Sequence, residues 1–212
     1  MPMNEVSKIP DFGSFAIVSY IPDPLGAFLT AIRQLLPGDQ IPQAHVTILP
    51  PRPLNIPVEA ASKQARRVLQ AFSSFEVELS TVQYFTETNF FYLDLSIGET
   101  VLHKLHDALN TGDLEHCEEF EFRPHVTLGG PVPAATLPSV HTQAKTLWKS
   151  AECAPRFSIR EIVFLWLSPS DPRGEWRRFW SQDLEGDPTK TQSLQPAELT
   201  RRASAGATAR TW

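Results

Sequence analysis

Two nearly identical tetrapeptides lie 80 residues apart in this chain: HVTI at residues 45–48 and HVTL at residues 125–128. Only six histidines occur in 212 residues, so chance repetition is a poor explanation. Side chains alternate between the two faces of a β-strand, so the His and Thr of each tetrapeptide share one face and the two apolar residues share the other. The sequence therefore predicts two matching strands, each with an apolar face for the core and a polar face for chemistry.

Prolines and apolar periodicity map the elements around these two strands. The expected strands occupy residues 15–21, 44–49, 75–80, 91–97, 122–128, 157–167 and 176–183. The expected helices occupy residues 24–36, 57–72, 99–112 and 136–150. Because the strand and helix pattern begins again near Glu99, the two halves resemble each other, and the predicted fold class is α+β with two similar lobes.

Length and composition limit the domain organisation. A chain of 212 residues that is 42% hydrophobic fits one compact domain, which we expect over residues 12–185. From residue 186 to 212 the chain is rich in Thr, Ser, Ala, Gln and Arg and poor in apolar residues. Such a segment cannot offset the entropy of ordering, so we predict a disordered C-terminal tail.

Charge and cysteine content exclude several classes of protein. A net charge of −5 does not supply the positive field of a protein that coats nucleic acid, so any contact with RNA must be local. Cys117 and Cys153 form neither a disulfide framework nor a zinc motif and indicate reduced thiols. The longest apolar run is Ile162–Leu167, and residues 1–10 contain no signal-peptide core. We therefore expect a cytoplasmic protein without membrane contact, and nothing in the sequence demands more than a monomer.

The polar faces of the two motifs suit phosphate chemistry. If the two strands face each other across a cleft, His45, Thr47, His125 and Thr127 converge on one small volume. Imidazole exchanges protons near neutral pH, so two histidines supply one base and one acid. Threonine hydroxyls donate hydrogen bonds to phosphate oxygens without adding charge.

These residues and the order of elements from Phe15 to Asp183 resemble the 2H phosphoesterase superfamily, in particular its 2′-5′ RNA ligase-like and cyclic phosphodiesterase branches. The resemblance implies two antiparallel β-sheets that face a central cleft, with helices on the outside. It also implies an enzyme without metal or other cofactor that acts on 2′,3′-cyclic phosphates, 2′-5′ linkages or related nucleotides. His45, Thr47, His125 and Thr127 match the four site positions of the family.

The sequence departs from this family in its basic residues. Members of the RNA ligase-like branch often carry a basic residue after the motif, whereas the second motif here is followed by Gly129, Gly130 and Pro131. Arg52 in the first loop and Arg123, two residues before His125, are candidate phosphate ligands. For both residues the alternative interpretation is a surface arginine that binds no phosphate. For Arg123 a further alternative is an ion pair with the acidic stretch 113–121. That stretch is itself expected to be a solvated loop, and we interpret the glycine pair as a turn.

Aromatic and other histidine residues supply further candidates. A nucleotide substrate needs an aromatic wall for its base. The candidates on strands or strand ends are Tyr84, Phe85, Phe90, Tyr92 and Trp166. His103 and His106 have a spacing that fits two metal ligands, but no third ligand is evident, so exposed helix histidines are the favoured interpretation. We also interpret His116 and His141 as surface residues.

The leading hypothesis is a metal-independent phosphodiesterase for a nucleotide or RNA terminus, in which one histidine activates water and the other protonates the departing ribose oxygen. The reverse reaction would join RNA ends. Which histidine is the base stays open at this point. The alternatives are a non-catalytic nucleotide-binding module of the same fold, a metal hydrolase built on His103 and His106, and two purely structural histidines.

Overall fold

Strands and helices alternate through most of the chain. The computed structural model describes residues 11–38 and 43–185, and the predicted tail at 186–212 lies outside the described residues. The strands are β1 (Ser14–Tyr20), β2 (His45–Pro53), β3 (Phe75–Tyr84), β4 (Phe91–Ile97), β5 (Val126–Gly129), β6 (Arg156–Ile159), β7 (Glu161–Leu167) and β8 (Arg177–Asp183). The helices are α1 (Leu25–Leu35), α2 (Val58–Leu69), α3 (Glu99–Leu109), the short 3₁₀ helix η1 (Gly112–Leu114) and α4 (Leu137–Lys149).

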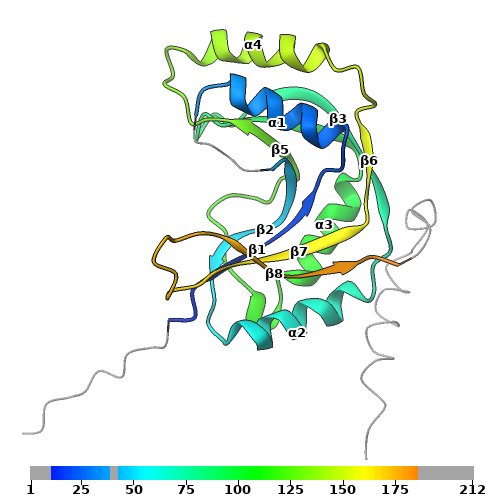
Figure 1. Cartoon of the computed structure of the whole chain (residues 1–212), viewed down its shortest axis with the longest axis vertical. Coiled ribbons are helices and arrows are strands. Elements are labelled where there is room, and N and C mark those ends of the chain that lie inside the picture. Colours follow the sequence, from blue (N-terminus) through cyan, green and yellow to red (C-terminus); the bar gives the residue numbers. More distant parts are fainter. Residues whose placement is uncertain (1–10, 39–42, 186–212) are drawn as a thin grey trace, which may run out of the picture.

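The strands form two four-stranded antiparallel sheets. The first sheet has the order β2-β1-β7-β8, and the second has the order β5-β4-β3-β6. Helices α1 and α4 pack against the second sheet, and α2 and α3 lie at the first (Figure 1). Edge strand β2 carries the first tetrapeptide, edge strand β5 carries residues 126–128 of the second, and the two strands contact each other. This confirms the predicted fold class, with two antiparallel sheets and outer helices.

The two lobes are not successive halves of the chain. The hairpin of β3 and β4 pairs with β5 in the second sheet, whereas the hairpin of β7 and β8 pairs with β1 in the first sheet. Each sheet therefore combines strands from both halves of the sequence. A repeat that begins at Glu99 describes the order of the elements but does not describe the composition of the sheets.

The strand expected over residues 157–167 is in fact two strands. Ile159 in β6 and Ile162 in β7 are both fully buried, and two residues lie between them. Burial alone does not reveal the break, because Ile162, Val163 and Phe164 are all fully buried and β7 is therefore covered on both faces. The chain breaks at Arg160, and β6 belongs to the second sheet while β7 belongs to the first.

Two further strand limits differ from the expectation. The strand expected over residues 122–128 begins only at Val126, after Pro124, which has no N–H to donate to a ladder. The strand expected to end at Leu49 continues through Pro50 and Pro51 to Pro53. Prolines are tolerated there because β2 is an edge strand of its sheet.

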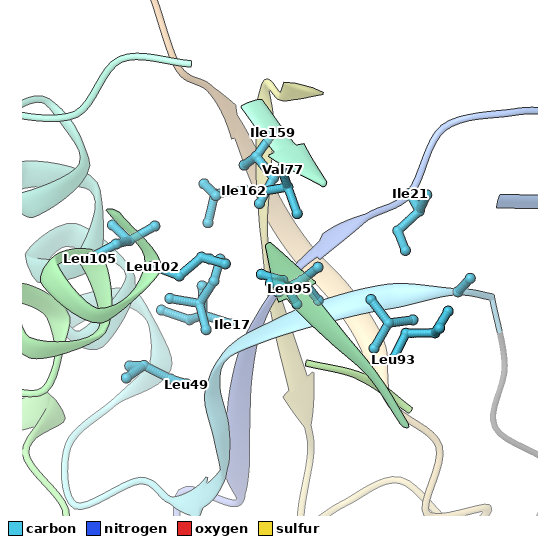
Figure 2. Packing of buried hydrophobic residues seen from close by; sticks show 14 of the residues in the cluster. Ile17, Ile21, Leu49, Val77, Leu93, Leu95, Leu102, Leu105, Ile159 and Ile162 are labelled. Carbon is cyan, nitrogen blue, oxygen red and sulfur yellow. The ribbon is translucent and has the colours of Figure 1, made fainter. Parts of the chain in front are cut away.

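One hydrophobic core joins the two sheets to α3. Figure 2 shows Leu102 and Leu105 of α3 on the same side as Ile17 of β1, Leu95 of β4 near the centre, and Leu93 on the other side, nearer Ile21; all belong to one buried cluster. Cys117 and Cys153 are free thiols. Within residues 11–38 and 43–185, no helix is long and apolar enough to cross a membrane.

Candidate active site

The two tetrapeptides have the same alternating burial. Val46, Ile48, Val126 and Leu128 have no solvent-exposed area. The histidine and threonine of each motif are half-buried, so they occupy the opposite face of the chain. The apolar pair of each motif therefore anchors its strand in the core and fixes the direction of the polar pair. The alternation predicted from the sequence is confirmed in both motifs, although His125 lies just before β5 rather than inside it.

The motifs meet at one cleft. Thr47, His125 and Thr127 line a cleft of about 910 Å³ together with Arg52 and Arg123. His45 lies two residues before Thr47, at the start of β2. Burial lowers the pKa of His45, and the positive charges of Arg33 and His125 lower it further. His45 lies beside this cleft through its neighbour Thr47 but is not among the residues that line it.

Both histidines are held in the same way. The Nδ1 atom of His45 lies 2.9 Å from the carbonyl oxygen of Gln43, and the Nδ1 atom of His125 lies 2.6 Å from that of Arg123. A carbonyl oxygen only accepts hydrogen bonds, so each Nδ1 carries the proton in the neutral ring. The Nε2 atom of each imidazole is then the nitrogen that exchanges protons with a substrate.

The environment of His125 is aromatic and buried. The rings of Phe85 and Tyr92 contact it edge to face, at centroid distances of 5.0 and 5.4 Å, and they stack on each other at 4.2 Å. Burial lowers the pKa of His125, while the hydrogen bond to the carbonyl of Arg123 raises it. The nearby charge of Arg123 lowers this pKa and that of Asp94 raises it.

The candidate base-stacking aromatics divide into two groups. Phe85 and Phe90 line the cleft, and Tyr92 lies behind His125, only 2% exposed. Tyr84 instead contacts Phe91 and His141. Trp166 packs on Phe179, and its Nε1 donates to the carbonyl of Phe12. The structure thus places Tyr84 and Trp166 outside the cleft lining.

Arg52 borders the cleft, but its guanidinium has protein partners. The side chain is 1% exposed and forms an ion pair with Glu118. Its Nη1 atom donates to Asn110 Oδ1 at 2.7 Å, and its Nε donates to the carbonyl of Pro50 at 3.1 Å. These contacts tie β2 to the loop after α3. The guanidinium of Arg52 is therefore engaged in holding the wall of the cleft.

Arg123 is an exposed residue at the mouth of the cleft. Its Nη2 atom lies 3.1 Å from Asp94 Oδ2, and its guanidinium lies over the ring of Tyr92 at 5.3 Å. The partner is thus Asp94 of β4 rather than the acidic stretch 113–121. The regular strand that would align Arg123 with His125 is absent, since β5 begins at Val126. The carbonyl of Arg123, however, orients the imidazole of His125.

Sequence reasoning missed Arg33. This buried residue lies in the last turn of α1, and its Nε donates to the carbonyl oxygen of Thr127 at 2.8 Å. Burial lowers its pKa to about 10, so it stays charged at neutral pH. The available signal was its position four residues after the core residue Leu29, on the apolar face of the helix.

His106 is buried rather than exposed, and His141 is half-buried. His106 is 6% exposed, stacks on Phe122 at 4.0 Å, and its Nε2 lies 3.0 Å from Glu118. The Nε2 of His141 lies 3.0 Å from the carbonyl of Val82. Glu118 also pairs with Arg52, so the stretch 113–121 is not simply a solvated loop. His116 is exposed, as predicted.

Metal ligands do not gather around His103 and His106. Among the described residues, no group of three or more His, Cys, Asp or Glu side chains could hold a metal ion. The glycine pair does not form the expected turn, since Gly129 is the last residue of β5 and Gly130 forms an isolated β-bridge with Gly38. Gly130 has φ +116°, and an added Cβ would lie 2.8 Å from the carbonyl oxygen of Asn89. Gly130 is therefore required by the backbone.

Comparisons with known proteins identify the family of this chain. A family model described as 2′-5′ RNA ligase superfamily matches residues 21–171. A Geobacillus kaustophilus protein named "Putative phosphoesterase GK0864" is 25% identical over 140 residues, which are 62% of this chain and 77% of that protein. A second protein, from Geobacillus sp. strain WCH70 and also named as a phosphoesterase, is 26% identical over 48% of this chain and 64% of its own length.

Solved structures share the fold. The structure of E. coli LigT complexed with 3′-AMP superimposes with a TM-score of 0.55 at 12% identity and covers 83% of this chain and 100% of LigT. The structure of Kluyveromyces marxianus Usb1 gives a TM-score of 0.50 at 13% identity and covers 73% of this chain and 94% of Usb1.

Proposed function

Because the chain belongs to the 2′-5′ RNA ligase superfamily of phosphoesterases, we propose that it is a metal-independent phosphodiesterase that opens 2′,3′-cyclic phosphates or cleaves 2′-5′ linkages by acid–base catalysis with two histidines. The observation that carries this proposal is the matched pair of imidazoles. Each donates its Nδ1 proton to a carbonyl two residues earlier in the chain and keeps Nε2 available.

The reaction needs one proton removed and one proton supplied. A water oxygen attacks phosphorus while a neutral Nε2 takes the water proton. The bond between phosphorus and one ribose oxygen breaks, and the Nε2–H of the other imidazole protonates that oxygen. The product is a nucleoside monophosphate, and the histidines end with exchanged protonation states.

The charges around the two rings favour one assignment of roles. We propose that His45 is the base, because the positive charge of Arg33 favours its neutral form. We propose that His125 is the acid, because the charges near its ring include the carboxylate of Asp94, which partly offsets the larger lowering of its pKa by Arg123. The charges that act on His45, by contrast, are all positive. When an RNA 5′-hydroxyl takes the place of water as the nucleophile, the same groups join two RNA ends.

Thr47 and Thr127 complete the proposed phosphate site. Both are half-buried and line the cleft with His125. Their hydroxyl groups would donate to the non-bridging oxygens, where negative charge grows in the transition state. Arg33 adds a buried positive charge behind Thr127, which compensates for the missing basic residue after the second motif.

A nucleotide substrate is supported by the relatives and by the cleft. E. coli LigT has been crystallised with phosphate, 3′-AMP and ATP. Phe85 and Phe90 in the present cleft offer aromatic surface for a base. We also propose that the enzyme works in the cytoplasm as a monomer, in keeping with its two free thiols.

The proposal is tested by incubating the purified full chain with 2′,3′-cyclic nucleotides in the presence of a chelator. We expect conversion to monophosphates, and a loss of about 10² to 10⁴-fold in turnover for His45→Gln and for His125→Gln. His141→Gln is the matched control, because His141 is a half-buried histidine that does not line the cleft, and should keep full activity.

Three outcomes would contradict the proposal. Binding without product over hours would instead indicate a nucleotide-binding module. Complete loss of activity in chelator would indicate a metal hydrolase. Full activity in either motif variant would remove the two-histidine mechanism.

A further inference from the structure

The cleft beyond His125 is acidic. The loop that follows α3 contributes Glu118, Glu119 and Glu121 to the lining, and Glu87 and Glu99 lie on other segments of the wall. Among the described residues, these five carboxylates share the lining with two guanidinium groups, those of Arg52 and Arg123. A phosphoesterase that bound a long polyanion in this cleft would be expected to line it with more guanidinium and ammonium groups than carboxylates.

Both guanidinium groups already have carboxylate partners. Arg52 pairs with Glu118, and Arg123 pairs with Asp94. Glu119 and Glu121 are exposed and form no ion pair with another described residue. The uncompensated charge on this side of the cleft is therefore negative, and it lies on the loop that leads directly to His125.

The same loop carries aromatic surface. Phe120 is 53% exposed, and Phe122 lies against His106 and His103. Phe85 and Phe90 complete a group of four phenylalanines in the cleft lining. A phenyl face accepts a nucleobase by stacking whatever the sequence, and neighbouring carboxylates accept hydrogen bonds from exocyclic amino groups.

We propose that the cleft selects a substrate with a single phosphodiester group, such as a nucleoside 2′,3′-cyclic phosphate, and disfavours a chain with further phosphates. The base of this substrate lies among the phenylalanines, while Glu119 and Glu121 repel any additional phosphate along the loop. This inference rests on the proposed function, since it names the substrate class of the same site.

The test compares two substrates that end in the same reacting group. One is a nucleoside 2′,3′-cyclic phosphate, and the other is a tetranucleotide with that nucleoside cyclic phosphate at its 3′ end. We expect kcat/KM for the tetranucleotide to be lower by about tenfold or more at low salt. Added salt should narrow this difference, because it screens repulsion between exposed charges.

Variants test whether the lower kcat/KM for the tetranucleotide is caused by the carboxylates of the loop after α3. The double variant Glu119→Gln/Glu121→Gln should raise the ratio of tetranucleotide to mononucleotide kcat/KM severalfold and reduce its dependence on salt. Glu115→Gln is the matched control: Glu115 is an exposed residue of the same loop that does not line the cleft, so the ratio should not change. Circular dichroism of each variant shows that the fold is kept.

The outcomes separate this inference from the proposed function. Turnover of both substrates with equal kcat/KM, or a ratio that the double variant leaves unchanged, would overturn the inference alone. Failure of the parent chain to convert either substrate would contradict the proposed function, and the inference would fall with it.

Discussion

The Nε atom of Arg33 donates to the carbonyl oxygen of Thr127 at 2.8 Å, which joins the last turn of α1 to the strand of the second motif. The same guanidinium charge lowers the pKa of His45, in the first motif. One buried side chain from a third element therefore acts on both motifs. Geometry and charge together make Arg33 a positioning residue between them.

Replacing Arg33 should change the pH dependence of the reaction. In Arg33→Gln the positive charge is lost, so the pKa of His45 rises. His45 must be neutral to act as the base, and the acidic limb of the kcat/KM profile should therefore move to higher pH. Loss of a buried charged hydrogen bond should also lower the free energy of unfolding by about 2 kcal/mol.

The matched control for this variant is Arg67→Gln, because Arg67 is also in the last turn of a helix but is exposed. The measurements are kcat/KM against pH and denaturant unfolding. Movement of the basic limb instead of the acidic limb would mean that His45 is the acid. An unchanged profile would show that Arg33 has no electrostatic role.

The parent enzyme should be most efficient on the acidic side of neutrality. Burial is the main cause that lowers the pKa of both His45 and His125. One histidine must be neutral and the other protonated, so kcat/KM should follow a bell centred below the ordinary histidine pKa of about 6.5. The apparent pKa values of the acidic and basic limbs describe the interacting pair of histidines and not either histidine alone.

Bound substrate should displace this bell. A phosphodiester carries negative charge, which favours both protonated imidazoles, so the profile of kcat should lie at higher pH than that of kcat/KM. Steady-state kinetics in buffers of constant ionic strength measure both profiles. A kcat/KM optimum above pH 7 would contradict the burial argument.

The threonine pair gives a test of transition-state stabilisation. Thr47→Val and Thr127→Val keep the shape of the side chain and remove the hydroxyl group. If each hydroxyl donates to a phosphate oxygen, kcat should fall about 10²-fold in each variant, with a smaller change in KM. Thr146→Val on the exposed face of α4 is the control and should leave kcat unchanged. An equal rise in KM with kcat preserved would show that the hydroxyls bind the ground state only.

Local patterns in the sequence were sufficient to predict the motif strands and the α+β class, whereas the two facing sheets were expected from the family resemblance. Alternation in residues 45–48 placed Val46 and Ile48 in the core, where they are fully buried. The apolar face of α2 was predicted in the same way, and Ala61 and Ala65 are fully buried. These features follow from a period of two or 3.6 residues and need no knowledge of distant contacts.

Non-local contacts could not be predicted in this way. The chain breaks at Arg160 because β6, with Ile159, joins the second sheet and β7, with Ile162, joins the first. The propensity to form a strand is the same for both isoleucines, so it does not predict the break. Burial of His106 depends on Glu118, which in turn depends on Arg52, 66 residues away in the chain. Arg33 is defined by a contact 94 residues away. The site residues missed from the sequence are those whose role depends on a partner in another element.

Variants of Arg52 distinguish a role of this residue in stabilising the fold from a role in binding phosphate. Its side chain is 1% exposed and that of Glu118 is 15% exposed, so Arg52→Met would leave a carboxylate largely buried without its cation. We expect the free energy of unfolding to fall by about 3 kcal/mol. The double variant Arg52→Met/Glu118→Gln should recover part of this loss, because it removes the uncompensated charge as well. Denaturant unfolding of the parent, both single variants and the double variant gives the coupling energy.

The KM for a 2′,3′-cyclic nucleotide, measured where each variant is fully folded, should stay close to that of the parent. A KM raised by tenfold or more in Arg52→Met, with stability unchanged, would show instead that the guanidinium binds the substrate phosphate.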